Sequence, residues 1–484
     1  MKDSIKTKTV KGVLWSGIEK IAFELIQFIV GIVLARILTP HDYGTVGLIT
    51  VFITISTLFI DGGLTTALIQ KKNRTETDFN TVFLFNLGMS VGFYCIIFLC
   101  APFVANFYHI EELTSLLRIL SLVLLITPFS SIQITQLTIN VDFKRISIVS
   151  VPSAIVSGII GIIMAYWGYG PYALVAQQVI MILMRTLLVN FISKYHIKLE
   201  FSKDSFKDLF SFSYKLVLSS SLDRIYTSLF TMIVGKKFSP SVLGCYTRGT
   251  QFVSMASGIL GDVFNRVTFP IMSSVQDELE QLRNIFRKYI QVSSFVIFGV
   301  LFCLLLIAKP LVLLLLTDKW INAVPIMQIM CLAYLTNHIS NINRNLLYTK
   351  KRSDLALKLE VIKKTIAFLI FIASIPFGII VVCWGQVVYN IIATLLNSYY
   401  TKRLIGISLV QQLTDYGKFL IIAFVSIIVP YYIMGYISLE LCQILLAGTL
   451  YFIIYLLLNA FLSTYPYMEL KKGLYTFIQK KSNK

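Results

Sequence analysis

Apolar stretches of about 20 residues recur along the whole chain, and each is long enough to cross a hydrocarbon layer about 30 Å thick. The 484-residue chain is 56% hydrophobic and only 14% charged, too few polar residues to surround a water-soluble core. The sequence therefore predicts an all-α polytopic membrane protein with about 14 transmembrane helices. Their approximate centres are residues 24, 56, 92, 126, 156, 182, 222, 258, 298, 334, 368, 391, 427 and 451.

The chain also contains an internal repeat. Residues 32–44 (IVLARILTPHDYG) and 232–244 (MIVGKKFSPSVLG) both carry a basic residue near the end of an apolar run, then a hydroxyl residue, a proline and a later glycine. Proline and glycine at a fixed offset indicate a short turn between helices. Three further short segments of the first copy have similar counterparts in the second copy, in the same order. Residues 101–103 are similar to 309–311, residues 144–145 to 351–352, and residues 170–179 to 378–387.

Loop charges predict the orientation. When loops are assigned alternately to the two sides, one side carries 27 lysines and arginines and the other only four. The positive-inside rule then places both termini in the cytoplasm. Because each repeat has six spans, the two copies share an orientation. We predict an N-terminal six-helix lobe (1–195), a cytoplasmic linker (196–206), a pseudo-symmetric C-terminal six-helix lobe (207–404), and two additional helices with a basic tail (405–484).

The linker region, residues 194–209, fits a basic amphipathic helix on anionic lipid as well as an ordinary solvated linker. The other loops are too short to form a catalytic domain. The sequence has no P-loop or HExxH motif, and its four histidines and seven cysteines lack ligand spacing. We therefore expect a transporter rather than an enzyme, with no metal, no cofactor and no nucleic-acid partner.

Charged side chains inside the spans indicate the candidate site, because each costs about 2.5–3.5 kcal/mol at mid-span and usually faces protein or water. In the span centred near 258, two arginines, Asp262 and Gln251 project onto one helical stripe. Basic residues outnumber acids in three such spans, which favours an anion, and arginine suits phosphate. The predicted substrate-binding cations are Arg224, Arg248, Arg266, Arg344 and Lys215.

The alternative is that these charges simply neutralise one another, for example Asp262 with Arg266 four residues on. Three acids are candidates for ion coupling: Glu24, Asp223 and Asp262. Glu24 fits this role only if Lys20, one turn before it, does not pair with it.

Four segments along the chain carry recognisable motifs: 61–108 (beginning DGGLTTALIQKKNRTETDFN), 168–177 (GYGPYALVAQ), 239–246 (SPSVLGCY) and 269–277. Together they resemble Wzx-type polysaccharide flippases, specifically the WzxC-like branch of the multidrug/oligosaccharidyl-lipid/polysaccharide exporter superfamily. One departure lies at residues 317–320 (TDKW), where relatives often have a glycine before the Lys-Trp pair.

This resemblance implies a MATE-like fold of two lobes that moves undecaprenyl-pyrophosphate-linked oligosaccharide across the bacterial cytoplasmic membrane by alternating access. The pyrophosphate would meet the cleft cations, and a polysaccharide polymerase and a chain-length regulator would be partners beside membrane lipids. Two alternatives stay open: a cation-coupled exporter of small molecules, and a membrane-embedded polymerase or glycosyl-transferring enzyme. Arginine-rich spans argue against the first and short outer loops against the second.

Overall fold

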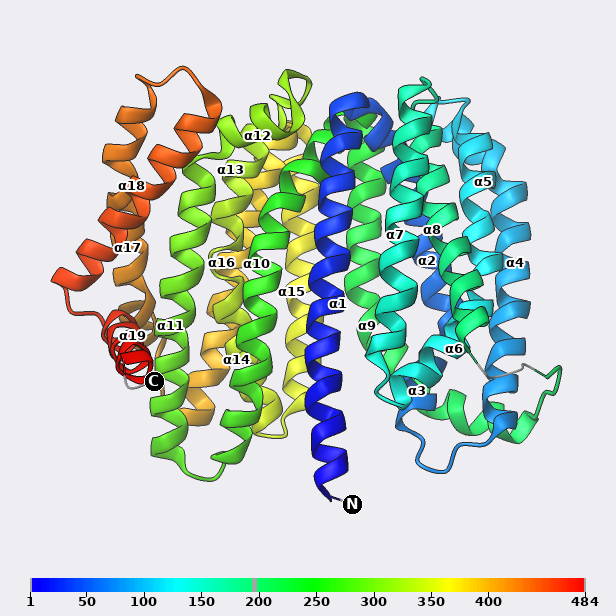
Figure 1. The fold of residues 1–484 in the computed structure, drawn as a ribbon, viewed down its shortest axis with the longest axis horizontal. Helices are drawn as coiled ribbons and strands as arrows, with labels where there is room; N and C mark the ends of the chain where they lie inside the picture. The colour runs from blue at the N-terminus through cyan, green and yellow to red at the C-terminus, as the bar shows by residue number, and fades with distance from the viewer. Residues whose placement is uncertain (1, 194–197, 483–484) are drawn as a thin grey trace. The chain divides into compact units, whose positions relative to one another are not determined.

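The computed structural model describes residues 2–193 and 198–482, and within them the chain forms two compact units divided after Gly244. Figure 1 shows that the long helices of each unit run side by side. The helices of the first unit are α1 (Lys2–Ile37), α2 (Pro40–Asp61), α3 (Leu64–Gln70), α4 (Glu76–Tyr108), α5 (Leu113–Ile126), α6 (Pro128–Ile139), α7 (Phe143–Tyr166), α8 (Pro171–Ile192) and α9 (Lys203–Lys237).

The second unit contains all but the first turn of α10, together with every later helix. Two short 3-10 turns, η1 (Asp318–Trp320) and η2 (Ile375–Phe377), interrupt its connections. Its helices are α10 (Pro240–Ser274), α11 (Leu279–Leu306), α12 (Ala308–Leu316), α13 (Ala323–Tyr334), α14 (Asn337–Thr349), α15 (Ser353–Ser374), α16 (Ile379–Ile405), α17 (Leu409–Met434), α18 (Glu440–Phe461) and α19 (Tyr465–Ser482).

The prediction of an all-α polytopic membrane protein is confirmed. Each of the predicted span centres lies in a helix. Among the described residues, eight helices are long and apolar enough to cross a membrane, or nine spans if α5 and α6, bent by 43°, form one. The remaining centres lie in helices that carry more charge, such as α9, or in the α13–α14 pair, which is broken between residues 334 and 337.

The internal repeat reappears in the order of the helices. Pro40 opens α2 and Pro240 opens α10, and in both turns the preceding hydroxyl side chain accepts a backbone N–H three residues on. Gly170 and Gly378, with φ of 52° and 98°, directly precede α8 and α16. The turns predicted from proline and glycine spacing are therefore formed in both copies.

The two proline turns also contact each other within the first unit. A Cβ atom on Gly44 would overlap the backbone of Pro240, and a Cβ atom on Gly244 would overlap the backbone of Pro40. Each glycine therefore packs against the proline that opens the other helix, a backbone approach that only glycine permits. The contact is reciprocal, as expected for two copies of one motif.

The predicted linker is only partly described, because residues 194–197 lie outside the described residues. From Lys198 to Ser202 the chain is not helical, and α9 begins at Lys203. The Lys198 backbone N–H donates to Asn80 Oδ1 at 3.1 Å, and the Ser202 N–H donates to Thr81 Oγ1 at 3.0 Å. These bonds tie the start of α9 to the start of α4. The lobe boundaries and the linker's contact with lipid stay predictions.

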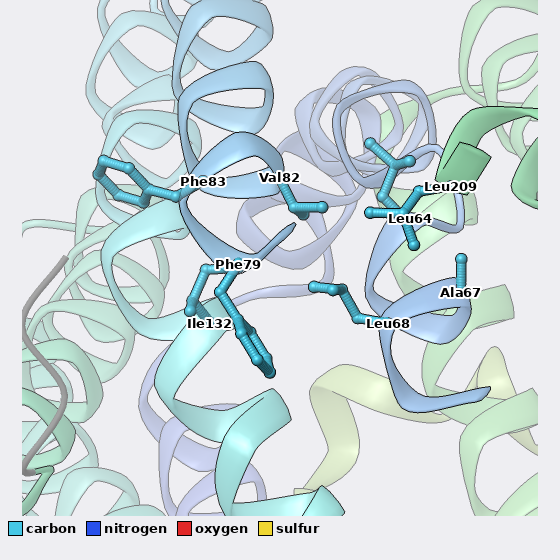
Figure 2. Packing of buried hydrophobic residues seen from close by; sticks show 8 residues of the cluster. All are labelled: Leu64, Ala67, Leu68, Phe79, Val82, Phe83, Ile132 and Leu209. Carbon is cyan, nitrogen blue, oxygen red and sulfur yellow. The ribbon is translucent and has the colours of Figure 1, made fainter. Parts of the chain in front are cut away.

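An apolar cluster holds α3, α4, α6 and α9 together (Figure 2). Burying such side chains contributes about 1.5–3 kcal/mol each relative to exposure to water. The cluster thereby fixes the positions of four helices that also line the cavity described below. Its members are Leu64, Ala67, Leu68, Phe79, Val82, Phe83, Ile132 and Leu209.

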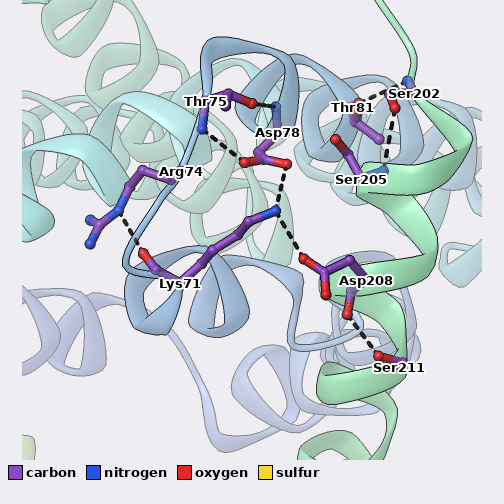
Figure 3. A network of polar contacts seen from close by, with 9 residues as sticks. All are labelled: Lys71, Arg74, Thr75, Asp78, Thr81, Ser202, Ser205, Asp208 and Ser211. Carbon is purple, nitrogen blue, oxygen red and sulfur yellow. Dashed lines mark hydrogen bonds and ion pairs between the residues drawn. The ribbon is translucent and has the colours of Figure 1, made fainter.

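A polar network joins the end of α3 to the first turns of α4 and α9 (Figure 3). Lys71 Nζ lies 3.0 Å from Asp78 Oδ1 and 2.9 Å from Asp208 Oδ2, so one cation bridges α4 and α9. Asp78 is buried and also accepts the Thr75 backbone N–H at 2.8 Å, which caps α4. Burial lowers the pKa of Lys71, but its hydrogen bonds to the two carboxylates outweigh this and raise the pKa overall. The lysine therefore stays charged at neutral pH, and the bridge to both carboxylates is kept there.

Replacing Asp78 with alanine is expected to destabilise the first unit by about 2 kcal/mol, because the change removes a helix cap and one partner of a largely buried ion pair. The measurement is the thermal unfolding midpoint of the purified protein in detergent. Asp354→Ala is the matched control, since Asp354 pairs with Arg352 on an exposed surface and should leave the midpoint unchanged. Equal midpoints for the two variants would contradict the role of Asp78.

Candidate functional site

A cavity of about 410 Å³ lies among the helices of the first unit. Seven helices contribute to its wall: α2, α3, α4, α5, α6, α8 and α9. Its volume is within the range of about 300–1,000 Å³ that is usual for ligand sites. Hydroxyl side chains dominate its polar lining: Thr57, Thr65, Thr127, Ser130, Ser131, Thr135 and Thr138.

The cavity forms where α5 breaks into α6. Pro128 has no backbone N–H, so it cannot donate the helical hydrogen bond to the carbonyl of Leu124, four residues earlier. The two helices bend by 43° at this point, and both residues line the cavity. The break therefore opens space inside a span and leaves a backbone acceptor beside that space.

The hydroxyl groups present acceptor lone pairs to the cavity. Thr127 donates its own hydrogen to the carbonyl of Val123 at 2.6 Å, and Thr135 and Thr138 donate to the carbonyls four residues before them. Thr65 Oγ1 donates to Asp61 Oδ1 at 2.7 Å, which places this carboxylate in the wall. Since the hydroxyl hydrogens are already used within the protein, the oxygens can accept hydrogen bonds from a ligand.

Two buried polar groups in the wall lack hydrogen-bond partners among the described residues. One is Arg185 Nε and the other is Oδ1 of Asn86, a residue only 3% exposed. Glu19 acts on Arg185 electrostatically. Such unsatisfied buried groups are costly, and they are common where a ligand completes the bonding.

The sequence analysis did not identify Arg185, although a signal was present. It is the only charged residue in α8, and a lone charge within an apolar span indicates a functional position. The predicted Arg224 of α9 lines the same cavity and is exposed. The wall of the cavity thus contains one arginine that the sequence analysis predicted, Arg224, and one that it did not, Arg185.

The predicted stripe on α10 lies largely on an exposed helix face. Asp262, Arg266 and Gln251 are exposed, whereas Arg248 is half-buried and donates a hydrogen bond to Gln251 Oε1 at 2.5 Å. Side chains at these positions therefore remain accessible at the surface of the second unit.

A hydrogen bond joins α14, which carries Arg344, to α10, which carries Arg266. Asn345 donates to Asn265 Oδ1 at 3.0 Å, and these asparagines directly adjoin the two arginines in sequence. Arg344 also lies 3.6 Å from the carboxylate of Glu360 on α15, which Lys363 contacts at 2.6 Å. The sequence left open that the candidate charges neutralise one another, and Glu360 does this for Arg344 in part. Because Glu360 is shared with Lys363, the three side chains together keep one net positive charge.

The remaining candidates are less informative. The side chains of Lys215 and Asp223 lie outside the described residues, and Glu24 is exposed on α1. Within the described part of the chain, His, Cys, Asp and Glu form no group that could hold a metal ion. Charged side chains thus gather in the wall of the cavity and at the α10–α14 cations, which are Arg248 and Arg266 of α10 and Arg344 of α14.

A family model described as "Polysaccharide biosynthesis protein" matches residues 33–325. An uncharacterized membrane protein of the cps region of Klebsiella pneumoniae is 26% identical over 85% of this chain and 86% of its own length. The lipopolysaccharide biosynthesis protein WzxC of Escherichia coli K12 is 26% identical over 85% of this chain and 84% of its own length. These similarities extend over most of the chain.

Among solved structures, the lipid II flippase MurJ in an inward closed conformation has a similar fold. The TM-score is 0.76, and the match covers 93% of this chain and all of the other, at 14% sequence identity. At this identity the similarity establishes the fold alone.

Proposed function

This chain belongs to the polysaccharide biosynthesis protein family, and from that membership we propose that it is a flippase for lipid-linked oligosaccharides. It carries repeat units attached to undecaprenyl pyrophosphate from the inner to the outer leaflet of the bacterial cytoplasmic membrane. The Wzx-type resemblance of the sequence agrees with the family match. The protein is accordingly a transporter for surface polysaccharide synthesis, and it works by alternating access.

The observation that carries this proposal is the cavity of the first unit, whose largely apolar wall carries hydroxyl and charged side chains, in a chain of this family. A lipid-linked oligosaccharide has a polar head that the bilayer interior excludes. A flippase must therefore offer hydroxyl and charged groups at membrane depth, and the seven hydroxyl side chains with Arg185 and Arg224 do so. A polymerase would instead need an acid or base cluster on a sizeable outer loop.

The pyrophosphate of the cargo is assigned to Arg248, Arg266 and Arg344, since guanidinium groups bind phosphate oxygens in pairs. Arg248 and Arg266 lie 18 residues apart on α10, which is about 27 Å, so they would contact the pyrophosphate at successive points of its path. Both termini lie in the cytoplasm in this proposal. Asp262, together with Glu24 and Asp223, remains a candidate for coupling to a proton or sodium gradient. A polysaccharide polymerase and a chain-length regulator would receive the translocated units.

Deleting the gene in its native host is expected to abolish surface polysaccharide and to trap complete lipid-linked repeat units on the cytoplasmic leaflet. The measurement combines surface polysaccharide staining with the accessibility of the lipid-linked units to an impermeant enzyme added outside. Restoring the wild-type gene should reverse both effects. Unpolymerised units accessible from outside would instead identify a polymerase, and normal polymer would support an exporter of other molecules.

A further inference from the structure

We propose that the cavity of the first unit is a sugar-recognition site, which holds one sugar residue of the transported repeat unit. This inference rests on the proposed function, because it names the part of the cargo that the cavity binds. In this proposal the sugar and the pyrophosphate bind at different sites: the sugar in the cavity, and the pyrophosphate at the α10–α14 cations.

The first argument is the excess of hydrogen-bond acceptors in the wall. The hydroxyls of α6 donate within their own helix, so Thr135 and its neighbours offer only oxygen lone pairs to a ligand. Asp61 and the carbonyl of Leu124, to which Pro128 cannot donate, add further acceptors. A suitable ligand must therefore bring several donors at once. Sugar hydroxyl groups are such donors, and each can also accept a hydrogen bond.

The second argument concerns Arg185 and Arg224, which are the donors of the wall. Arginine presents a planar fork of N–H groups that can bond two neighbouring oxygens, such as adjacent sugar hydroxyls or a sugar carboxylate. With Asp61, the wall carries a net charge of one positive unit. That charge admits a neutral sugar or a sugar with a single acidic group.

A pyrophosphate is a poorer ligand for this cavity. The pyrophosphate of the cargo is esterified at both ends, so at neutral pH it has acceptor oxygens and no hydroxyl donors. It would face the lone pairs of the α6 hydroxyls without forming hydrogen bonds. The Asp61 carboxylate would also repel it at short range.

The test uses the purified full chain in detergent and isothermal titration with glucose, galactose, N-acetylglucosamine, glucuronate and inorganic pyrophosphate. We expect at least one sugar to bind, and the combined Ser131→Ala and Thr135→Val changes to weaken that binding about tenfold, because two hydrogen bonds are lost. Thr54→Val is the matched control. Thr54 also donates to a carbonyl of its own helix but does not line the cavity, so binding should be unchanged.

Two results would overturn the sugar site. One is the absence of binding by any of these sugars at the highest soluble concentration. The other is binding of pyrophosphate that competes with the sugar and is lost in Arg185→Ala. Either result would leave the flippase proposal standing as long as the deletion strain traps repeat units inside. Normal polysaccharide in that strain would refute the flippase proposal instead.

Discussion

Replacing Gly44 with alanine is expected to remove nearly all folded protein from the membrane. The added methyl group would occupy the position of the Pro240 backbone, which cannot move without displacing the starts of both α2 and α10. Overpacking in a well-packed region costs about 1–3 kcal/mol, and an overlap with backbone rather than with a flexible side chain should exceed this range. The measurement is the amount of monodisperse protein recovered from the membrane.

The matched control is Gly88→Ala in α4, where an added Cβ atom has no neighbour within 4 Å. That variant should accumulate as well as the wild type, or slightly better, since alanine favours helix. Gly244→Ala should behave like Gly44→Ala, because its Cβ atom would overlap Pro40 in the same way. Wild-type recovery of either turn variant would show that this contact is looser than the structure indicates.

The combined Arg248→Ala and Arg266→Ala changes are expected to reduce polysaccharide export at least 100-fold while membrane abundance stays normal. Each charge-assisted hydrogen bond to a phosphate contributes about 1.5–3 kcal/mol, so the loss of two should be severe. Both residues lie on α10, and Arg266 is exposed, so their removal should not unfold the protein. The measurement is surface polysaccharide in a deletion strain that expresses the variant.

Lysine at both positions should restore export only in part, because lysine keeps the charge but lacks the planar fork of arginine. Arg352→Ala serves as a control for the loss of a cation, since Arg352 forms an exposed pair with Asp354. Normal export by the double alanine variant would exclude these two arginines as pyrophosphate contacts.

The fold could be predicted well from the sequence, because length and hydropathy determine which segments can cross a bilayer. The repeat of proline and glycine also located the turns at residues 39–44 and 239–244, which the structure forms. The break between α5 and α6 was not predicted. A proline within an apolar run is compatible with a kinked span as well as with two helices, and only packing against neighbours decides between them.

The candidate site could be predicted only in part. Arg224 and Arg266 were proposed from the sequence because several charged residues in one span are easily noticed. Arg185 was missed because it is a single charge in a long apolar helix, and its importance follows from the α6 hydroxyls that surround the same cavity. Those hydroxyls are individually ordinary in membrane helices. Their convergence on one space depends on tertiary structure, which residue types alone do not reveal.

The reciprocal contact between the two proline turns has a further consequence. The two partners of this contact are copies of the same turn, because Pro40 packs on Gly244 and Pro240 packs on Gly44. Contacts of this kind are isologous, and they are the rule at the interfaces of two-fold symmetric homodimers. A half-length chain carrying one such turn could satisfy the contact by pairing with an identical chain. The present single chain therefore contains a contact that, in a protein of half its length, would lie at the interface of a homodimer.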